Sequence, residues 1–299
     1  MEGTMIEISV MTDQLGLDFE SAVKQLAHWG VEWVDLRGGI YGKGIDDVTD
    51  SEAERAKDAL VEHGLRVACL ATRLASPWKD HDLWDERDWE AELEHLDRLV
   101  ELAKAFNTDL LRVYAYRKPN PDAALDRPDL EKYMEPVSQR LREAAEVAAG
   151  QDIRLVLENE TFSLVGTCSE LRQVLDAVGH EALLACWDVA NGWACGEQPY
   201  PDGYDQIRDS IGYVHIKGAK SQTGDPDAYG GVALVGQDDL DYQTILSALV
   251  SDGYDGKIAL HPHHNLFLDA YKLRDEANPD LKVTWLTLQR MREILAGIG

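Results

Sequence analysis

The chain has 299 residues, 44% of them hydrophobic, which is enough to bury a large core as one domain. Acidic residues outnumber basic ones by 55 to 29, and the net charge of −26 argues against nucleic acid as a ligand, because phosphates require a basic footprint. No apolar run approaches the roughly 18 residues of a membrane span. The N-terminal MEGTMIEISVMTD lacks a basic segment followed by an apolar one. These features predict a soluble, cytoplasmic protein that does not bind a membrane.

The acidic residues are spread along the whole chain, although two stretches, 46–58 and 80–97, hold many of them. An acidic patch for a basic partner is one interpretation. A solvated acidic shell suited to high salt fits the even spread better, since salt screens the self-repulsion that such a charge causes. The composition therefore favours a halophilic protein.

The four cysteines, Cys69, Cys168, Cys186 and Cys195, are far apart in the sequence and form no CxxC pair. This spacing suits a reducing compartment and predicts neither a disulfide framework nor a zinc knuckle. Cys186 lies in an apolar run, where a small buried thiol is expected.

In chain order, eight short apolar runs rich in β-branched residues alternate with longer helical stretches. Nearly continuous apolar runs are typical of parallel strands buried on both faces. Eight alternations in about 300 residues fit a closed barrel better than an open sheet, so the sequence predicts an α/β fold, a (β/α)8 TIM barrel, with 1–299 as a single domain. The predicted strands are 6–11, 31–37, 65–71, 110–116, 153–158, 183–188, 211–217 and 257–261.

Amphipathic patterns between these runs predict helices, several of which end at glycine, the residue expected just past a helix end. No glycine-rich phosphate-binding motif follows any predicted strand, so neither a dinucleotide site nor a P-loop is indicated. Two long stretches, 72–87 and 218–240, are predicted to be loops above the barrel mouth. The predicted helices are 18–30, 50–64, 89–107, 129–150 and 169–179, with N-caps at Asp18, Asp50 and Thr167.

Charged and imidazole side chains stand at the ends of the later predicted strands. Glu158 ends the fifth strand, Asp188 ends the sixth, and His215 lies near the end of the seventh. His261 ends the eighth. Because TIM-barrel active sites are assembled at the C-terminal ends of strands, we expect these side chains to converge. Two carboxylates and two imidazoles suit manganese, zinc, cobalt or iron better than calcium or magnesium, which prefer oxygen ligands.

The second half of the chain contains LENE at 157–160, WDVANGW at 187–193 and IALHPHH at 258–264. Through these segments it resembles the sugar phosphate isomerase/epimerase family of xylose-isomerase-like TIM barrels. The N-terminal half agrees more weakly, through segments such as GVEWVDLRG at 30–38. The resemblance implies one divalent metal ion, with manganese or zinc expected, and a small carbohydrate substrate; a homo-oligomer is compatible with it.

In that family, a strand-five Glu, a strand-six Asp, a strand-seven His and a strand-eight Glu bind the metal. The first three correspond to Glu158, Asp188 and His215. The fourth position departs from the family pattern, because His261 stands where the family has glutamate. A neutral imidazole can still bind a metal, so the resemblance implies His261 as the fourth ligand.

The departure also removes a carboxylate that serves as one of two bases in family epimerases. Glu158 is expected to act as one base, and Glu160 and His263 are candidates for the second, since both lie beside the ligands. For His263, a hydrogen bond that supports a ligand is an equally good interpretation.

Four further residues near the predicted mouth are candidates for binding substrate. Arg112 lies within the fourth strand, where phosphate or polyol binding and an internal salt bridge are both reasonable roles. Lys217 follows His215 at the end of the seventh strand. Asn191 and Trp193 come just after the sixth strand and could hydrogen-bond to a sugar or stack on it. Arg37, after the second strand, is expected to be structural.

The sequence thus predicts a metal-dependent isomerase or epimerase of a small sugar, sugar phosphate or keto-polyol. A dehydratase of the inosose or dehydroshikimate type shares the scaffold and metal and stays open as an alternative. A nuclease of the endonuclease IV type is disfavoured, because Asn191 stands where those relatives have a zinc-binding histidine. A sugar-binding barrel that has lost catalysis is the non-enzymatic alternative, and the His261 replacement is its best support.

Overall fold

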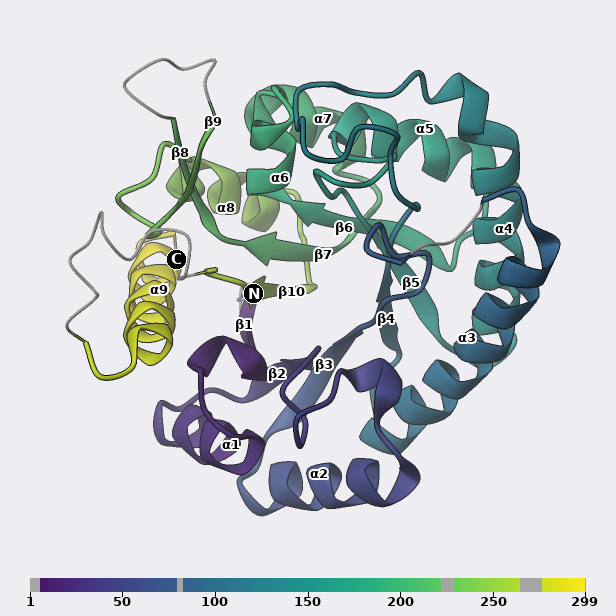
Figure 1. The fold of residues 1–299 in the computed structure, drawn as a ribbon. Helices are drawn as coiled ribbons and strands as arrows, with labels where there is room; N and C mark the ends of the chain where they lie inside the picture. Colours follow the sequence, from purple (N-terminus) through teal and green to yellow (C-terminus); the bar gives the residue numbers. More distant parts are fainter. Residues whose placement is uncertain (1–5, 80–82, 222–228, 264–275, 299) are drawn as a thin grey trace.

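The computed structural model describes residues 6–79, 83–221, 229–263 and 276–298, and its core is a ring of eight parallel strands (Figure 1). The strands close in the order β1-β10-β7-β6-β5-β4-β3-β2, which confirms the predicted (β/α)8 barrel. Each strand pairs with the one before and after it among the eight, as sequential βαβ units require. The barrel strands are β1 Glu7–Met11, β2 Trp33–Leu36, β3 Arg66–Ala71, β4 Leu110–Val113, β5 Arg154–Glu158, β6 Leu183–Asp188, β7 Ile211–Ile216 and β10 Lys257–Leu260.

Helices surround the ring of strands and bury their apolar faces against it (Figure 1). The five predicted helices are confirmed within a few residues, as α1 to α5. The described residues form four further helices that were not predicted, and two of these, α8 and α9, complete the outer layer after β7 and β10. The helices are α1 Phe19–His28, α2 Asp50–Glu62, α3 Glu86–Phe106, α4 Glu131–Ala149, α5 Cys168–Val178, α6 Val189–Ala194, α7 Tyr204–Ile207, α8 Tyr242–Ser251 and α9 Pro279–Ala296.

Two predicted segments differ from the structure. The stretch 218–240 is not wholly a loop, because β8 (Gly218–Ser221) and β9 (Tyr229–Ala233) form an antiparallel hairpin beside the barrel (Figure 1). The fourth strand ends at Val113 rather than at Tyr116. Tyr116 has a φ of 57°, a left-handed conformation that a strand cannot continue through.

The helix caps follow local hydrogen-bonding rules. Asp18 and Thr167 are N-caps as predicted, since their side chains accept the backbone N–H groups of Ser21 and Glu170. The cap of α2 is Thr49 rather than the predicted Asp50, which is instead the first residue of the helix. A threonine three residues before a glutamate forms a reciprocal capping box, which outcompetes an isolated aspartate at the next position.

The barrel interior changes from apolar to charged along the strands. Six of the strands each contribute a side chain to one apolar cluster: Cys69, Leu110, Val156, Cys186, Tyr213 and Ala259. Successive inward side chains of a strand are two residues apart. The next inward positions on these same strands are therefore Ala71, Arg112, Glu158, Asp188, His215 and His261, all of them buried.

Not all of the acidic residues in the two acid-rich stretches are solvated. The Asp46 side chain is only 1% exposed and lies 3.2 Å from His95 Nε2, and the buried Glu92 pairs with Lys79. All four cysteines are buried free thiols. Within the described residues, no helix is both long enough and apolar enough to cross a bilayer.

The capping box of α5 should contribute measurably to stability. Replacing Thr167 with alanine removes the acceptor for the Glu170 N–H, and we expect it to lower the free energy of unfolding by about 1 kcal/mol. Urea unfolding of T167A against S169A checks this, because Ser169 lies exposed in the same helical turn. Equal losses in both variants would contradict the assignment of Thr167 as the cap.

Candidate metal centre

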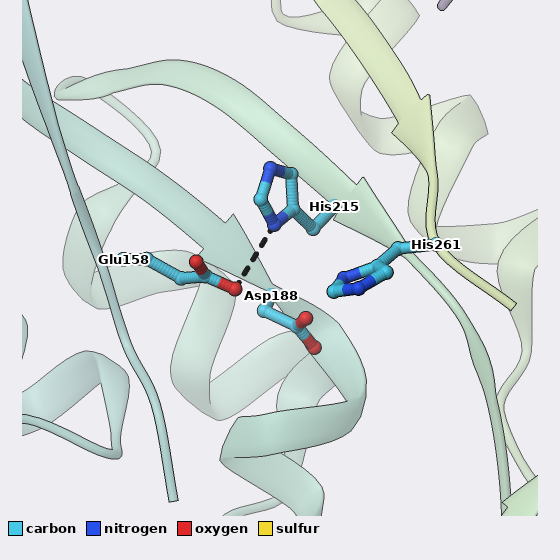
Figure 2. A group of neighbouring side chains, drawn as sticks. All are labelled: Glu158, Asp188, His215 and His261. Carbon is cyan, nitrogen blue, oxygen red and sulfur yellow. Dashed lines mark hydrogen bonds and ion pairs between the residues drawn. The ribbon is translucent and has the colours of Figure 1, made fainter. Parts of the chain in front are cut away.

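Four side chains from consecutive barrel strands converge at the C-terminal mouth (Figure 2). Glu158 and Asp188 end β5 and β6, His215 is the penultimate residue of β7, and His261 directly follows β10. One ligand atom from each of the four lies within 4.8 Å of the others, and all four residues are buried. A metal about 2.1 Å from each donor holds the donors roughly 3 to 4.2 Å apart, so a small rotation of the side chains brings the widest pair into range. The geometry therefore fits one divalent ion.

Glu158 lies between an imidazole and a guanidinium. Its Oε1 is 3.0 Å from His215 Nδ1, the contact drawn as a dashed line in Figure 2, and its Oε2 is 3.3 Å from Arg112 Nε. Burial alone would raise the pKa of Glu158, but the charges of His215 and Arg112 outweigh burial and lower the pKa to about 2. The carboxylate is thus held ionised, the form that a metal ligand needs.

Asp188 is fixed by both of its neighbours along the barrel. Its Oδ2 lies 3.0 Å from Lys217 Nζ, and its Oδ1 accepts the backbone N–H of Asn191 at 2.9 Å. The Asn159 side chain bridges to the Asp188 backbone, accepting its N–H at 2.8 Å and donating to its carbonyl at 2.9 Å. Burial raises the pKa of Asp188 and the Lys217 charge opposes that rise. The position of this carboxylate is therefore set before any ligand arrives.

His261 presents a neutral imidazole to the cluster. Burial lowers the pKa of His261 well below its usual value, and the charges of His263 and Arg37 act in the same direction. Its Nε2 contacts Arg37 Nη1, whereas its Nδ1 is buried and has no hydrogen-bond partner among the described residues. A buried nitrogen without a partner is costly unless something coordinates it. The ring thus fits the role of a metal ligand.

A cavity of about 550 Å³ opens beside the four side chains. This volume lies in the range of small-molecule sites. Its lining includes five of the residues predicted to touch substrate or move protons, together with the predicted ligand His261; the five are Arg112, Glu160, Asn191, Lys217 and His263. Trp193 does not line it; this side chain lies on α6, partly buried against the hydrophobic core, so stacking on a substrate falls to other aromatic residues.

Glu160 and Lys217 are linked through one amide on the cavity wall. Asn191 accepts from Lys217 Nζ at 2.7 Å and donates to Glu160 Oε2 at 3.3 Å. The Thr161 hydroxyl donates to the other Glu160 oxygen at 2.8 Å. Burial raises the pKa of Glu160, and the Lys217 charge opposes that rise. The His263 ring also lines the cavity and lies against His261, with centroids 3.8 Å apart and ring planes tilted by 41°.

Several residues of the site were not predicted from the sequence. Asn159 follows Glu158 and braces Asp188, a role that only the paired strands make visible. Arg37 was expected to be structural, yet it lines the cavity, and so does the unpredicted Arg73. Three aromatic residues, Trp78, Tyr114 and Phe162, also face the cavity.

Residues 23–284 match the sequence profile described as a xylose isomerase-like TIM barrel. The chain belongs to this family. The barrel is similar to a 3-dehydroshikimate dehydratase of Bacillus anthracis, at 24% identity over 210 residues that cover 70% of this chain and 67% of the relative.

Solved structures of this xylose isomerase-like barrel fold cover almost the whole chain. A xylose isomerase-like TIM barrel protein from Mycobacterium smegmatis in complex with magnesium is 16% identical, with 99% of this chain and 98% of that one covered and a TM-score of 0.72. D-psicose 3-epimerase with D-tagatose from Clostridium cellulolyticum H10 is 15% identical, with 97% and 99% covered and a TM-score of 0.72. At these identities the structural likeness establishes the fold.

Substitutions at His261 should change which metals this xylose isomerase-like barrel prefers. We expect H261A to weaken metal binding by more than the roughly 10- to 100-fold that loss of an outer-shell partner costs. H261E should retain binding but lower the preference for zinc over magnesium, because a third carboxylate replaces an imidazole. Competition calorimetry with both metals measures this, with H28A on helix α1 as the control. Unchanged affinities in H261A would exclude His261 as a ligand.

Proposed function

We propose that the chain is a metal-dependent isomerase or epimerase of a small sugar, sugar phosphate or keto-polyol. One divalent ion, manganese or zinc, is held by Glu158, Asp188, His215 and His261. The observation that carries the proposal is the convergence of these four buried ligand atoms at the mouth of the barrel, beside a cavity lined by groups that can transfer protons.

The reaction begins with removal of a proton from the carbon beside a substrate carbonyl. A bound divalent ion would supply Lewis-acid polarisation of the carbonyl. Lys217 Nζ, held at the cavity by Asn191 and Asp188, can donate a hydrogen bond to the oxygen on which negative charge develops. Arg112 holds Glu158 in place and can contact a substrate hydroxyl from the cavity wall.

Two residues that line the cavity, Glu160 and His263, can move the proton. The Glu160 carboxylate faces the cavity and can accept the proton from carbon. Returning it to the neighbouring carbon completes an aldose–ketose isomerisation and needs no second base. Delivery of a different proton to the original carbon from the opposite face would complete an epimerisation, and a protonated His263 is the group available to supply that proton. Glu158, which is proposed as a metal ligand, can also orient the substrate or take part in the proton transfer.

A dehydratase is the second candidate function, and the Bacillus anthracis relative favours it. Dehydration starts with the same proton removal and then expels a hydroxyl group from the next carbon as water. Lys217 or His263 can protonate that hydroxyl as it leaves. Because His261 replaces a carboxylate, a reaction that needs one base fits the chain's residues at least as well as epimerisation does.

Glu160 is the residue on which turnover should depend. With metal-loaded protein in D2O, we expect E160Q to slow deuterium exchange beside the carbonyl of D-tagatose or an inosose by roughly 10²- to 10⁴-fold. Metal content should stay unchanged, because Glu160 is not among the four ligand residues. Proton NMR follows the exchange, and E94Q on the exposed face of α3 is the control. Full exchange in E160Q would assign the proton transfer to another group.

The two candidate reactions differ in their products. Incubation with 3-dehydroshikimate gives a dihydroxybenzoate and water if the chain is a dehydratase, and the aromatic product is read by near-ultraviolet absorbance. Exchange on ketoses without formation of this product would support the isomerase or epimerase. Protein that holds metal and binds these compounds but exchanges no proton would contradict both reactions and favour a barrel that only binds sugars.

A further inference from the structure

Two arginines that follow neighbouring strands of the barrel line the cavity wall. Arg37 follows β2 and Arg73 follows β3, and both line the cavity. Each is two positions beyond an interior residue, Asp35 on β2 and Ala71 on β3, so each belongs to the next inward layer. The same layer on the other side of the cavity carries Lys217, and Arg112 lies one layer deeper.

Acidic side chains fix the two guanidiniums, and one of these acids, Asp46, itself lines the cavity. Arg37 Nε donates to Asp13 at 2.8 Å, and Arg73 Nη2 donates to Asp47 at 2.5 Å. Asp46, whose side chain is 1% exposed, accepts the Arg73 backbone N–H at 2.7 Å and lies 3.5 Å from Arg73 Nε. Burial would raise the pKa of Asp46, but its hydrogen bonds to His95 and to the Arg73 backbone lower it, so this carboxylate stays ionised.

The anchors of Arg73 use only one edge of its guanidinium, whereas Arg37 contacts Asp13 through Nε and His261 through Nη1. Within the described residues, Nη1 of Arg73 and Nη2 of Arg37 have no hydrogen-bond or ion-pair partner, and the Arg73 side chain is 46% exposed. A guanidinium held along one edge presents its remaining N–H groups in a fixed direction, which suits a planar or tetrahedral oxyanion.

The cavity also has an aromatic wall. Trp78 packs edge-on against Tyr114, with ring centroids 5.2 Å apart, and lies 5.9 Å from Phe162. The Arg112 guanidinium stacks over the Tyr114 ring at 4.1 Å, which holds that ring in place. A pocket with one cationic edge and one flat apolar wall selects a ligand that has a charged end and a flat apolar face.

The cationic groups in the cavity contrast with the strongly negative net charge of the chain. The chain has 29 basic residues against 55 acidic ones, yet in this cavity four basic residues stand against three acidic ones, Asp46, Asp122 and Glu160. A net charge of −26 repels anions at long range, so an anionic ligand needs local cations to bind. A neutral sugar needs no such group at the rim.

We propose that the substrate of this site is an acid: a small compound with a carboxylate or phosphate held by Arg73 and Arg37, and a flat face against Trp78. Its carbonyl end points to the metal centre. This proposal rests on the proposed function, because it concerns the same cavity, and it narrows the substrate to compounds that carry a negative charge.

Two pairs of ligands that differ mainly in charge test the proposal by calorimetry on metal-loaded protein. The carboxylate pair is 3-dehydroshikimate and its methyl ester, and the phosphate pair is D-fructose 6-phosphate and D-fructose. In wild type, we expect the anion of at least one pair to bind roughly 10- to 100-fold more tightly than its neutral partner, as the loss of a charge-assisted hydrogen bond predicts. Which pair shows the difference identifies the anion.

The variant R73Q should remove most of this preference for the anion and leave the affinity for the neutral partner unchanged. R73K keeps the charge but not the planar fork, so its preference for the anion should lie between those of wild type and R73Q. R66Q is the matched control, because Arg66 starts the same strand at the opposite end of the barrel and stacks on Trp33. Melting temperature and metal content, measured on each sample, verify that the variants are folded and loaded.

Equal affinity of wild type for the anionic and neutral members of both pairs would overturn the proposal. The proposal would also be overturned if folded, metal-loaded R73Q lost the same amount of binding affinity for the anion as for its neutral partner. If none of the four compounds binds, the acid subsite is also rejected. Metal content of the same samples then shows separately whether the metal-dependent function fails with it.

Discussion

The site depends on one geometric constraint, the two-residue alternation of side chains along parallel strands in a closed barrel. Each strand that contributes an apolar residue to the interior contributes its next inward residue two positions later. Val156 leads to Glu158 and Glu160 in this way, and Tyr213 leads to His215 and Lys217. The apolar layer, the ligand layer and the cavity wall are therefore three successive levels of the same strands, and none can shift without the others.

Charge balance lets such a polar layer exist inside a barrel. Two buried carboxylates face two buried cations, Arg112 on Glu158 and Lys217 on Asp188. Isolated burial of any one of the four would cost several kcal/mol, whereas the paired arrangement offsets that cost with short contacts and hydrogen bonds. The same pairs hold the carboxylates ionised and oriented, so the features that make the layer stable also prepare it to bind a cation.

The sequence predicted the barrel and the convergence of four side chains at its mouth because both follow from patterns along the chain: apolar runs, and charged or imidazole residues at their ends. It missed Asn159 and the role of Asp46, because both act through partners that are distant in the sequence. It placed Trp193 at the substrate because that residue follows a strand, but a helix begins at Val189 and turns the indole toward the core. The conformation of the segment that follows a strand decides where such a side chain points, and the hydrophobic periodicity of the sequence does not predict that conformation.

The most direct test of the account is the metal content of the purified protein, determined by mass spectrometry after preparation without chelator in molar KCl. Wild type and the surface variant E94Q should each hold about one equivalent of a divalent metal, and E158Q should hold much less, since it loses an ionised ligand that nothing nearby replaces. If wild type holds no metal and takes none up when it is added, or if E158Q holds as much as wild type, the four side chains are not a metal centre.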